Sequence, residues 1–142
     1  MTMTPDQFDA FLELSAVGIQ NASLHDAMQD CLDVIHGGVE DAFAAKVDSA
    51  GAAWPPRKDK LTHPLLVKSG KLKAAATTGG TVGDRELTTS IKGADVPYAA
   101  THQNGSTKRN IPRREYQYAT EETLDACAEI IADAGLEAIF PH

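Results

Sequence analysis

The stretch "LHDAMQDCLDVIHGGVEDAFAAKVD", residues 24–48, decides the fold of this chain. Its apolar residues recur at steps of three and four, at Leu24, Ala27, Met28, Cys31, Leu32, Ile35, Val39, Ala42, Phe43 and Val47. This spacing predicts an amphipathic helix over about 24–48 that buries one face, with Ser23 and Asp26 as its start signal. The pair Gly37-Gly38 costs such a helix about 1 to 2 kcal/mol relative to alanines, so we expect a bend or another backbone packed close.

Two more helices are predicted, one near each end of the sequence. The first begins at Thr4, with Pro5 at the first helical position and Gln7 completing a capping box. Its apolar face carries Phe8, Phe11, Leu12 and residues 15–19. The last begins near Thr120, where acidic residues suit the positive end of the helix dipole. Its expected apolar face consists of Leu124, Cys127, Ala128, Ile131, Gly135, Leu136 and Ile139.

The middle of the chain loses this periodicity. Residues 48–64 form a long loop rich in Gly, Pro and charge, of the length that is usually functional or mobile. A short helical turn is expected over 65–72, with Gly70 as a break. Residues 74–78 and 87–92 flank "GGTVGDRE" and predict a hairpin.

After the hairpin, "DVPYAATHQNG" predicts one or two helical turns that stop at Gly105, and Ile111-Pro112 begins an extended segment. The 142 residues are most simply one domain, 1–142. Long N-terminal helices and a C-terminal helix packed on a small antiparallel sheet make this an α+β fold with a long central loop.

The formal charge is distributed unevenly along the chain. Residues 1–50 carry −8, residues 51–114 carry +8 and residues 115–142 carry −7. A basic middle between acidic ends predicts attraction within one chain or between copies of it. The basic side chains of the middle, at Arg57, Lys58, Lys60, Lys68, Lys71, Lys73, Lys108, Arg109, Arg113 and Arg114, are also able to contact nucleic acid without reading its sequence.

Composition argues against several classes of protein. The first residues lack the pattern of a secretory signal, and no window reaches the length of a membrane span. Cys31 and Cys127 are expected to be buried reduced thiols rather than a disulfide, because the chain reads as cytosolic. Two cysteines without clustered histidines do not make a zinc site, so neither a metal nor a cofactor is expected.

Catalytic signatures are weak. "SGKLK" at 69–73 lacks the frame of a phosphate loop, and the usual hydrolase motifs do not occur. His102 shares a predicted helical turn with Tyr98 and is the one candidate general base, although a structural histidine bonded to backbone or to Gln103 is the commoner arrangement. The chain is therefore not expected to be an enzyme.

Three islands of sequence carry a resemblance: "WPPR" followed by "PLLVKSGKL", then "PYAATHQNG", then "IPRREY". In this order they resemble the virion-morphogenesis or tail-completion family of long-tailed bacteriophages, which carries W-x-P-L, L-x-x-S/T-G-x-L, Y-A-x-x-H-Q-x-G and I-P-x-R-x-F/Y. The matching positions are Trp54, Pro56, Leu65, Leu66, Ser69, Gly70, Leu72, Tyr98, Ala99, His102, Gln103, Gly105, Ile111, Pro112, Arg114 and Tyr116. The chain departs from the family at Arg57, Ala74 to Ala76, and Asn104.

The resemblance implies a structural protein of the virion neck. Such proteins form a ring, typically six-fold, at the head–tail junction, where they terminate or complete the tail and join it to the head connector. Their partners are other copies of the chain, the tail tube protein and connector or adaptor proteins, with assembly in the host cytoplasm. The alternative is a head-completion, adaptor or stopper protein that contacts the portal side and the DNA in the channel.

The residues expected to form assembly contacts are Trp54, Pro56, Arg57, Lys68, Gly70, Lys71, Tyr98, His102, Gln103, Arg113, Arg114 and Tyr116. Trp54 would supply a rigid anchor, and Arg114 a donor fork for a carboxylate across an interface. A core position for the aromatic residues and an ion pair within the chain for Arg114 are the alternatives.

Overall fold

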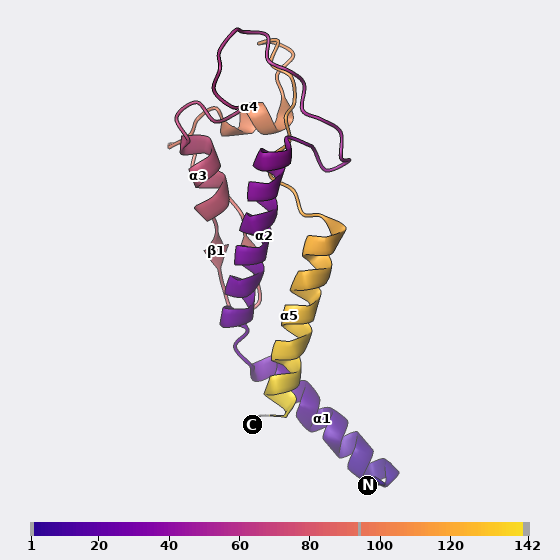
Figure 1. Ribbon diagram of the computed structural model, residues 1–142. Coiled ribbons are helices and arrows are strands. Elements are labelled where there is room, and N and C mark those ends of the chain that lie inside the picture. The colour runs from indigo at the N-terminus through magenta and orange to yellow at the C-terminus, as the bar shows by residue number, and fades with distance from the viewer. Residues whose placement is uncertain (1, 94, 141–142) are drawn as a thin grey trace.

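A computed structural model describes residues 2–93 and 95–140 (Figure 1). The elements in chain order are α1 (Pro5–Asn21), α2 (His25–Ala45), α3 (Lys71–Thr78), β1 (Thr81–Val82), β2 (Leu87–Thr88), α4 (Ala99–Asn104) and α5 (Glu121–Ile139). The expected α+β class, with long N-terminal helices, a C-terminal helix and one small antiparallel sheet, is confirmed.

Helix α2 is the axis of the molecule. Its buried residues are Ala27, Met28, Cys31, Leu32, Val39, Ala42 and Phe43, all of them predicted from the spacing. In Figure 1, α5 runs along one flank of α2 while α3 and β1 lie along the other. Helix α2 therefore buries side chains on two sides and not along one narrow apolar stripe.

The ends of α2 differ from the prediction in detail. Its N-cap is Leu24 and not Ser23, whose hydroxyl donates to Asp84 Oδ1 at 2.9 Å and accepts from His25 N at 3.4 Å. The helix ends at Ala45, where Lys46 adopts a left-handed conformation with φ 56°. At Gly38 an added Cβ would lie 3.3 Å from Thr123 Oγ1, so the close neighbour expected there is a side chain of α5 and not a backbone.

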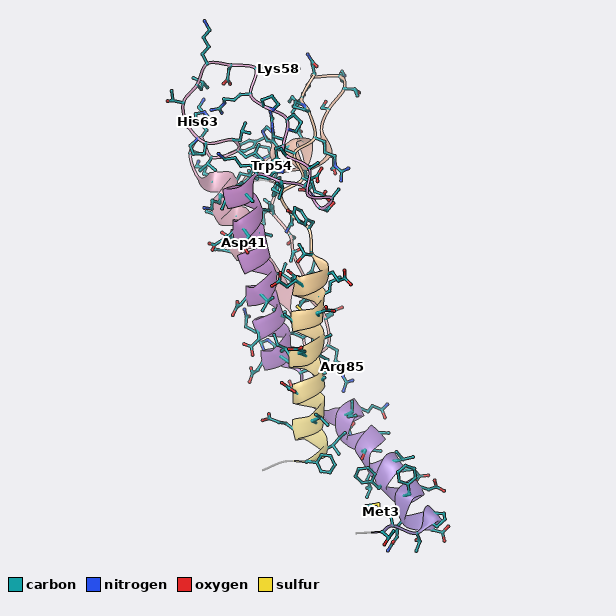
Figure 2. The ribbon with its side chains drawn as sticks, turned by 45° about the vertical axis from the view of Figure 1, so that its right-hand side comes forward. Met3, Asp41, Trp54, Lys58, His63 and Arg85 are labelled. Atoms are coloured by element: carbon teal, nitrogen blue, oxygen red, sulfur yellow. The ribbon has the colours of Figure 1, made fainter. Side chains whose placement is uncertain are left out.

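Helix α1 begins as predicted. Thr4 is the N-cap, and both bonds of its capping box with Gln7 are present, at 2.9 and 3.3 Å. No residue of α1 is buried: Phe11, Ser15 and Gly18 of its predicted apolar face are half-buried, while Phe8 is 50% and Leu12 48% exposed. The helix projects beyond the rest of the fold, and Phe11 stacks on Phe140 of α5 with ring centroids 5.9 Å apart (Figures 1 and 2).

Helix α5 begins at its predicted N-cap, where the Thr120 hydroxyl accepts from Thr123 N at 3.1 Å. Its predicted apolar face was right in part: Cys127, Gly135 and Ile139 are half-buried, but Leu124 is 57% and Leu136 is 55% exposed. The less exposed side consists mainly of small residues: Thr123, Ala126, Cys127, Ile130, Ala134, Gly135, Ala138 and Ile139. Small side chains let two helices approach closely, and this close packing leaves the larger leucines outside.

Two predictions for the middle of the chain were wrong. Helix α3 begins after Gly70 instead of breaking there, because Gly70 serves as an N-cap with φ 76°. Residues 74–78 are helical and not a strand, in keeping with the high helix propensity of three consecutive alanines. The hairpin that does form is shorter and pairs Thr81 with Thr88 and Val82 with Leu87.

The loop at 48–64 contains no helix or strand, as predicted, apart from an isolated bridge between Val47 and Ala53.

Cys31 and Cys127 are free thiols that face one another across α2 and α5. Burial and the neighbouring Cys127 raise the pKa of Cys31 to about 11. Within the described residues no helix combines the length and apolarity needed to cross a membrane.

A substitution at Gly105 tests whether the turn after α4 requires glycine. Its φ is 75°, and an added Cβ would lie 2.8 Å from Arg113 N. Gly105→Ala should lower the free energy of unfolding by about 1 to 3 kcal/mol, measured by denaturant titration. Gly37→Ala is the matched control, because Gly37 is helical with no atom near its Cβ position, and it should instead add about 0.5 to 1 kcal/mol. Equal effects of the two substitutions would contradict this account.

Candidate functional site

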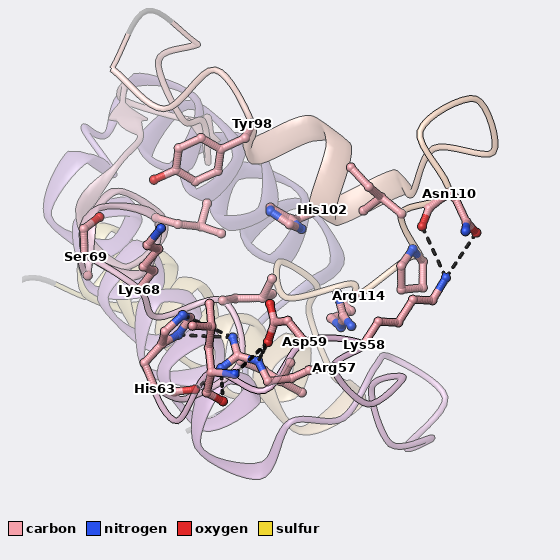
Figure 3. A pocket seen from close by; sticks show the side chains of 17 residues that line it. Arg57, Lys58, Asp59, His63, Lys68, Ser69, Tyr98, His102, Asn110 and Arg114 are labelled. Carbon is pink, nitrogen blue, oxygen red and sulfur yellow. Dashed lines mark hydrogen bonds and ion pairs between the residues drawn. The ribbon is translucent and has the colours of Figure 1, made fainter.

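The end of the molecule opposite α1 is built from three segments: the loop at 48–70, helix α4 and residues 105–119. We call this end the head, and Figure 2 shows it at the far end from Met3. It contains a cavity of about 640 Å³, the head pocket (Figure 3). The pocket is lined by Arg57, Lys58, Asp59, Leu61, His63, Leu65, Leu66, Lys68, Ser69, Gly70, Leu72, Tyr98, His102, Asn110, Ile111, Pro112 and Arg114.

An aromatic cluster under the pocket holds the head to α2. Phe43 makes an edge contact with Trp54 at 5.7 Å and a tilted contact with Tyr116 at 5.5 Å, measured between ring centroids. Trp54 Nε1 donates to Glu115 O at 2.9 Å, and Tyr116 Oη donates to Ala99 O at 3.0 Å. Trp54 and Tyr116 are 5% and 2% exposed, so within one copy both are core residues rather than surface anchors.

Arg114 holds the central loop in place. Its Nε donates to Pro55 O at 2.9 Å, and its Nη2 donates to Pro56 O at 3.1 Å. Within one copy the guanidinium therefore does not form the alternative ion pair with a described residue, but binds two carbonyls that have no regular secondary structure to satisfy them. Burial, followed by the charge of Arg57, lowers the pKa of Arg114, and Asp59 acts in the opposite direction.

Gln103 joins α4 to the segment that returns to α5. Its Oε1 accepts from Tyr116 N at 3.0 Å and from Gln117 N at 3.1 Å, while its Nε2 donates to Gln117 O at 2.9 Å. One amide side chain thus satisfies three backbone groups of a segment without a strand partner. Its role within one copy is structural.

His102 lies at the wall of the pocket, with its ring 5.9 Å from that of Tyr98 in a T-shaped contact. Its Nδ1 is buried and has no hydrogen-bond partner among the described residues. Burial, and then the charge of Arg114, lowers the pKa of His102 and keeps the imidazole neutral. In the part of the chain that is described, no carboxylate, hydroxyl or thiol is hydrogen-bonded to the His102 ring.

The rim of the pocket is basic. Arg57 Nε lies 3.0 Å from Asp59 Oδ1, and the Arg57 guanidinium also binds the carbonyls of Leu61 and His63. Lys58 Nζ donates to Asn110 Oδ1 at 3.1 Å, which ties the loop to the turn at 107–110 (Figure 3). These bonds give the loop a defined shape although it contains no helix or strand.

The predicted site residues divide into three groups. Arg57, Lys68, Gly70, Tyr98, His102 and Arg114 are brought together around the pocket. Trp54, Gln103 and Tyr116 lie beneath it and hold its walls. Pro56, Lys71 and Arg113 are exposed, with Arg113 paired to Glu115 at 3.3 Å. Leu61 and His63 were missed as pocket residues, because a leucine and a histidine in an aperiodic loop give no signal of their own.

Comparisons with known proteins do not place the chain in a family. No family model, curated protein or solved structure matches it. Over residues 2–93 and 95–140, no group of three or more His, Cys, Asp or Glu side chains is arranged to hold a metal ion.

The lowered pKa of His102 predicts a pH dependence of stability. Below its ordinary value of 6.5 the unfolded chain binds a proton at this residue that the folded chain does not, so acidification favours unfolding. Between pH 7.5 and pH 5.5 the native protein should lose more stability than His102→Gln does, in denaturant titrations at each pH. His25→Gln, at an exposed position of α2, should lose as much as the native protein. If His102→Gln also followed the native curve, the imidazole would not be held neutral by the fold.

Proposed function

We propose that this protein is a structural assembly protein whose copies join one another, and that it completes the tail of a long-tailed phage as a ring at the head–tail junction. The observation that carries the proposal is the distribution of charge and exposed apolar side chains over one elongated molecule. Opposite charges are gathered at its two ends, and several large apolar residues have no cover within one copy.

The helical part of the molecule is acidic. Residues 115–142, which include α5, contain seven acidic and no basic residues, and residues 1–50, which include α1 and α2, contain nine acidic and one basic residue. The head carries most of the basic residues. Surfaces of opposite sign on one molecule steer copies into head-to-tail contact and disfavour contact between like ends.

The exposed apolar residues lie on the helices and not in the core. Phe8, Leu12 and Val17 of α1 and Leu124 and Leu136 of α5 are each about half exposed. So many large apolar side chains left exposed by one small molecule favour a surface that another molecule covers.

The polar groups of the head favour binding over chemistry. Arg114, Gln103 and Trp54 use their donors to hold loop carbonyls, and Arg57 pairs with Asp59. These contacts shape the loops of the head. Such a preformed surface costs little ordering entropy when a partner docks.

The place in the virion is supported by the resemblance of three islands, "WPPR" followed by "PLLVKSGKL", then "PYAATHQNG" and "IPRREY", to tail-completion proteins. In the fold these segments meet in the head. Trp54 donates to the carbonyl of Glu115, Arg114 donates to that of Pro56, and the ring of Tyr116 packs against Phe43. On this proposal the partners are further copies in a ring of six, the tail tube protein and the head connector.

A second candidate is a stopper that contacts DNA in the channel of the ring. It is favoured by Lys60, Lys108 and Arg109, which are exposed on the head loops and have no carboxylate within 4.0 Å among the described residues. Such lysines and arginines are the usual means of neutralising phosphates without reading sequence.

The main proposal predicts assembly. At high protein concentration the mass measured by light scattering or native mass spectrometry should approach that of six copies, and the protein should bind to the ends of purified tail tubes. High salt should weaken the assembly, because opposite charges attract the copies. A chain that stays monomeric at every concentration and does not bind tail tubes would contradict the proposal.

The stopper predicts retention on duplex DNA that falls steeply as salt rises. Lys108→Glu should reduce the retention and flatten its salt dependence, because one phosphate contact is lost. Lys92→Glu changes the charge equally at an exposed residue outside the head loops, and it should have a smaller effect. Equal retention of native protein and Lys108→Glu would leave the ring without a DNA contact at this loop.

A further inference from the structure

We propose that helix α1 of one copy docks into the head pocket of the next copy, with its apolar side chains in the pocket and its acidic side chains on the basic rim. This inference rests on the proposed function, because it names the contact by which the copies join. The interface is heterologous: one end of each molecule meets the other end of its neighbour.

Helix α1 presents an apolar row beside an acidic row. Phe8 and Leu12 are one turn apart, so they share a face, and each is about half exposed. Asp9 and Glu13 follow them by one residue and form a parallel row. Within the described residues neither carboxylate has a basic group within 4.0 Å, so both charges lack a protein partner in a single copy.

Helix α1 is held in its projecting position by defined contacts. The Arg85 guanidinium, from the turn of the hairpin, binds the carbonyls of Ile19, Gln20 and Ala22 at the C-terminal end of α1. The stacking of Phe11 on Phe140 fixes the helix against the end of α5. A helix held in this way loses little freedom on docking, as a preorganised arm should.

The position of α1 requires that its partner be a second molecule. Figures 1 and 2 show α1 at one end of the long axis and the head at the other, with the whole length of α2 between them. The arm therefore cannot reach the pocket of its own chain. A second copy brings the same arm to the same pocket without any change of fold.

The head pocket matches the arm in chemistry. Its apolar lining includes Leu61, Leu65 and Ile111, and Leu61 is 51% exposed. Lys58 and Lys68 line the same cavity, and among the described residues neither lies within 4.0 Å of a carboxylate. A volume of about 640 Å³ accommodates the side chains of one helical face.

Charge disfavours α1, α5 and the groove between α2 and α5 as partners of α1. An α1–α1 contact places acidic rows together, and residues 115–142, which include α5, contain no basic residue. The groove between α2 and α5 is lined by Glu40, Asp41 and Glu122, so it repels the arm as well. The head offers both apolar surface and positive charge.

The test uses two blocked chains of full length. Leu12→Asp blocks the arm, and Leu61→Asp blocks the pocket; both positions are about half exposed in one copy, so thermal unfolding should stay close to that of the native chain. Each variant alone should assemble at least roughly tenfold more weakly than the native protein by native mass spectrometry. Leu14→Asp, at an exposed residue on the opposite side of α1 from Leu12, should assemble normally.

Mixing the two blocked chains distinguishes a contact between arm and pocket from a symmetric contact between like ends. Leu12→Asp keeps a working pocket, and Leu61→Asp keeps a working arm, so an equimolar mixture should form dimers of one chain of each kind and nothing larger. A symmetric contact between like ends would leave the mixture as weakly associated as its components. That result would overturn the proposal.

A charge exchange provides an independent check that does not depend on apolar substitutions. Asp9→Lys and Lys68→Glu should each weaken assembly, and the double variant should recover part of the loss, because the pair is restored with reversed signs. Asp41→Lys, in the groove between α2 and α5, should leave assembly unchanged. Weakening by Asp41→Lys without weakening by Asp9→Lys would place the contact on the groove and overturn the proposal.

The possible failures are distinguishable. If the native chain neither self-associates nor binds tail tubes, the proposed function fails, and this inference fails with it. If the native chain forms rings and Leu12→Asp forms them equally well, the proposed function stands and the docking of α1 is wrong.

Discussion

The packing of Phe43 between Trp54 and Tyr116 is the contact on which the head depends. It joins the C-terminal end of α2 to the long loop and to the segment that returns to α5. Neither the loop nor the returning segment has a helix or strand of its own there, so hydrogen bonds from Trp54, Gln103 and Arg114 take the place of a backbone ladder. A buried backbone must find partners, and here side chains supply them.

Within one copy, other elements cover α2 but leave large parts of α1 and α5 exposed. Helix α2 is packed on both flanks, by α5 and by α3 with the hairpin, and it contributes seven buried residues. Helix α5 approaches it through small residues, and α1 contributes no buried residue. The large apolar residues of α1 and α5 are left in solvent, and a protein with such faces gains stability when another molecule covers them.

Several features of the fold could be predicted because they depend on neighbouring residues. The period of α2, the capping box of Thr4 and the cap at Thr120 are local patterns, and all three were confirmed. The strand expected at 74–78 was wrong because three alanines favour a helix once Gly70 provides its start. The apolar face of α5 was only partly right, because burial depends on how closely two helices approach, and periodicity alone does not state which apolar side chains lie inside.

The candidate site followed the same division. Residues 51–114 could be recognised as basic from their composition alone, and six of the predicted residues do meet at the head pocket. Leu61 and His63 could not be assigned to it, because an aperiodic loop takes its shape from long-range bonds such as those from Arg114 to Pro55 and Pro56. The sequence by itself determined the helices and the sign of each segment's charge, since both are properties of residues close in the chain. Only the tertiary structure decided which side chains are buried, which line the pocket and which remain uncovered, because these depend on contacts between residues far apart in the chain.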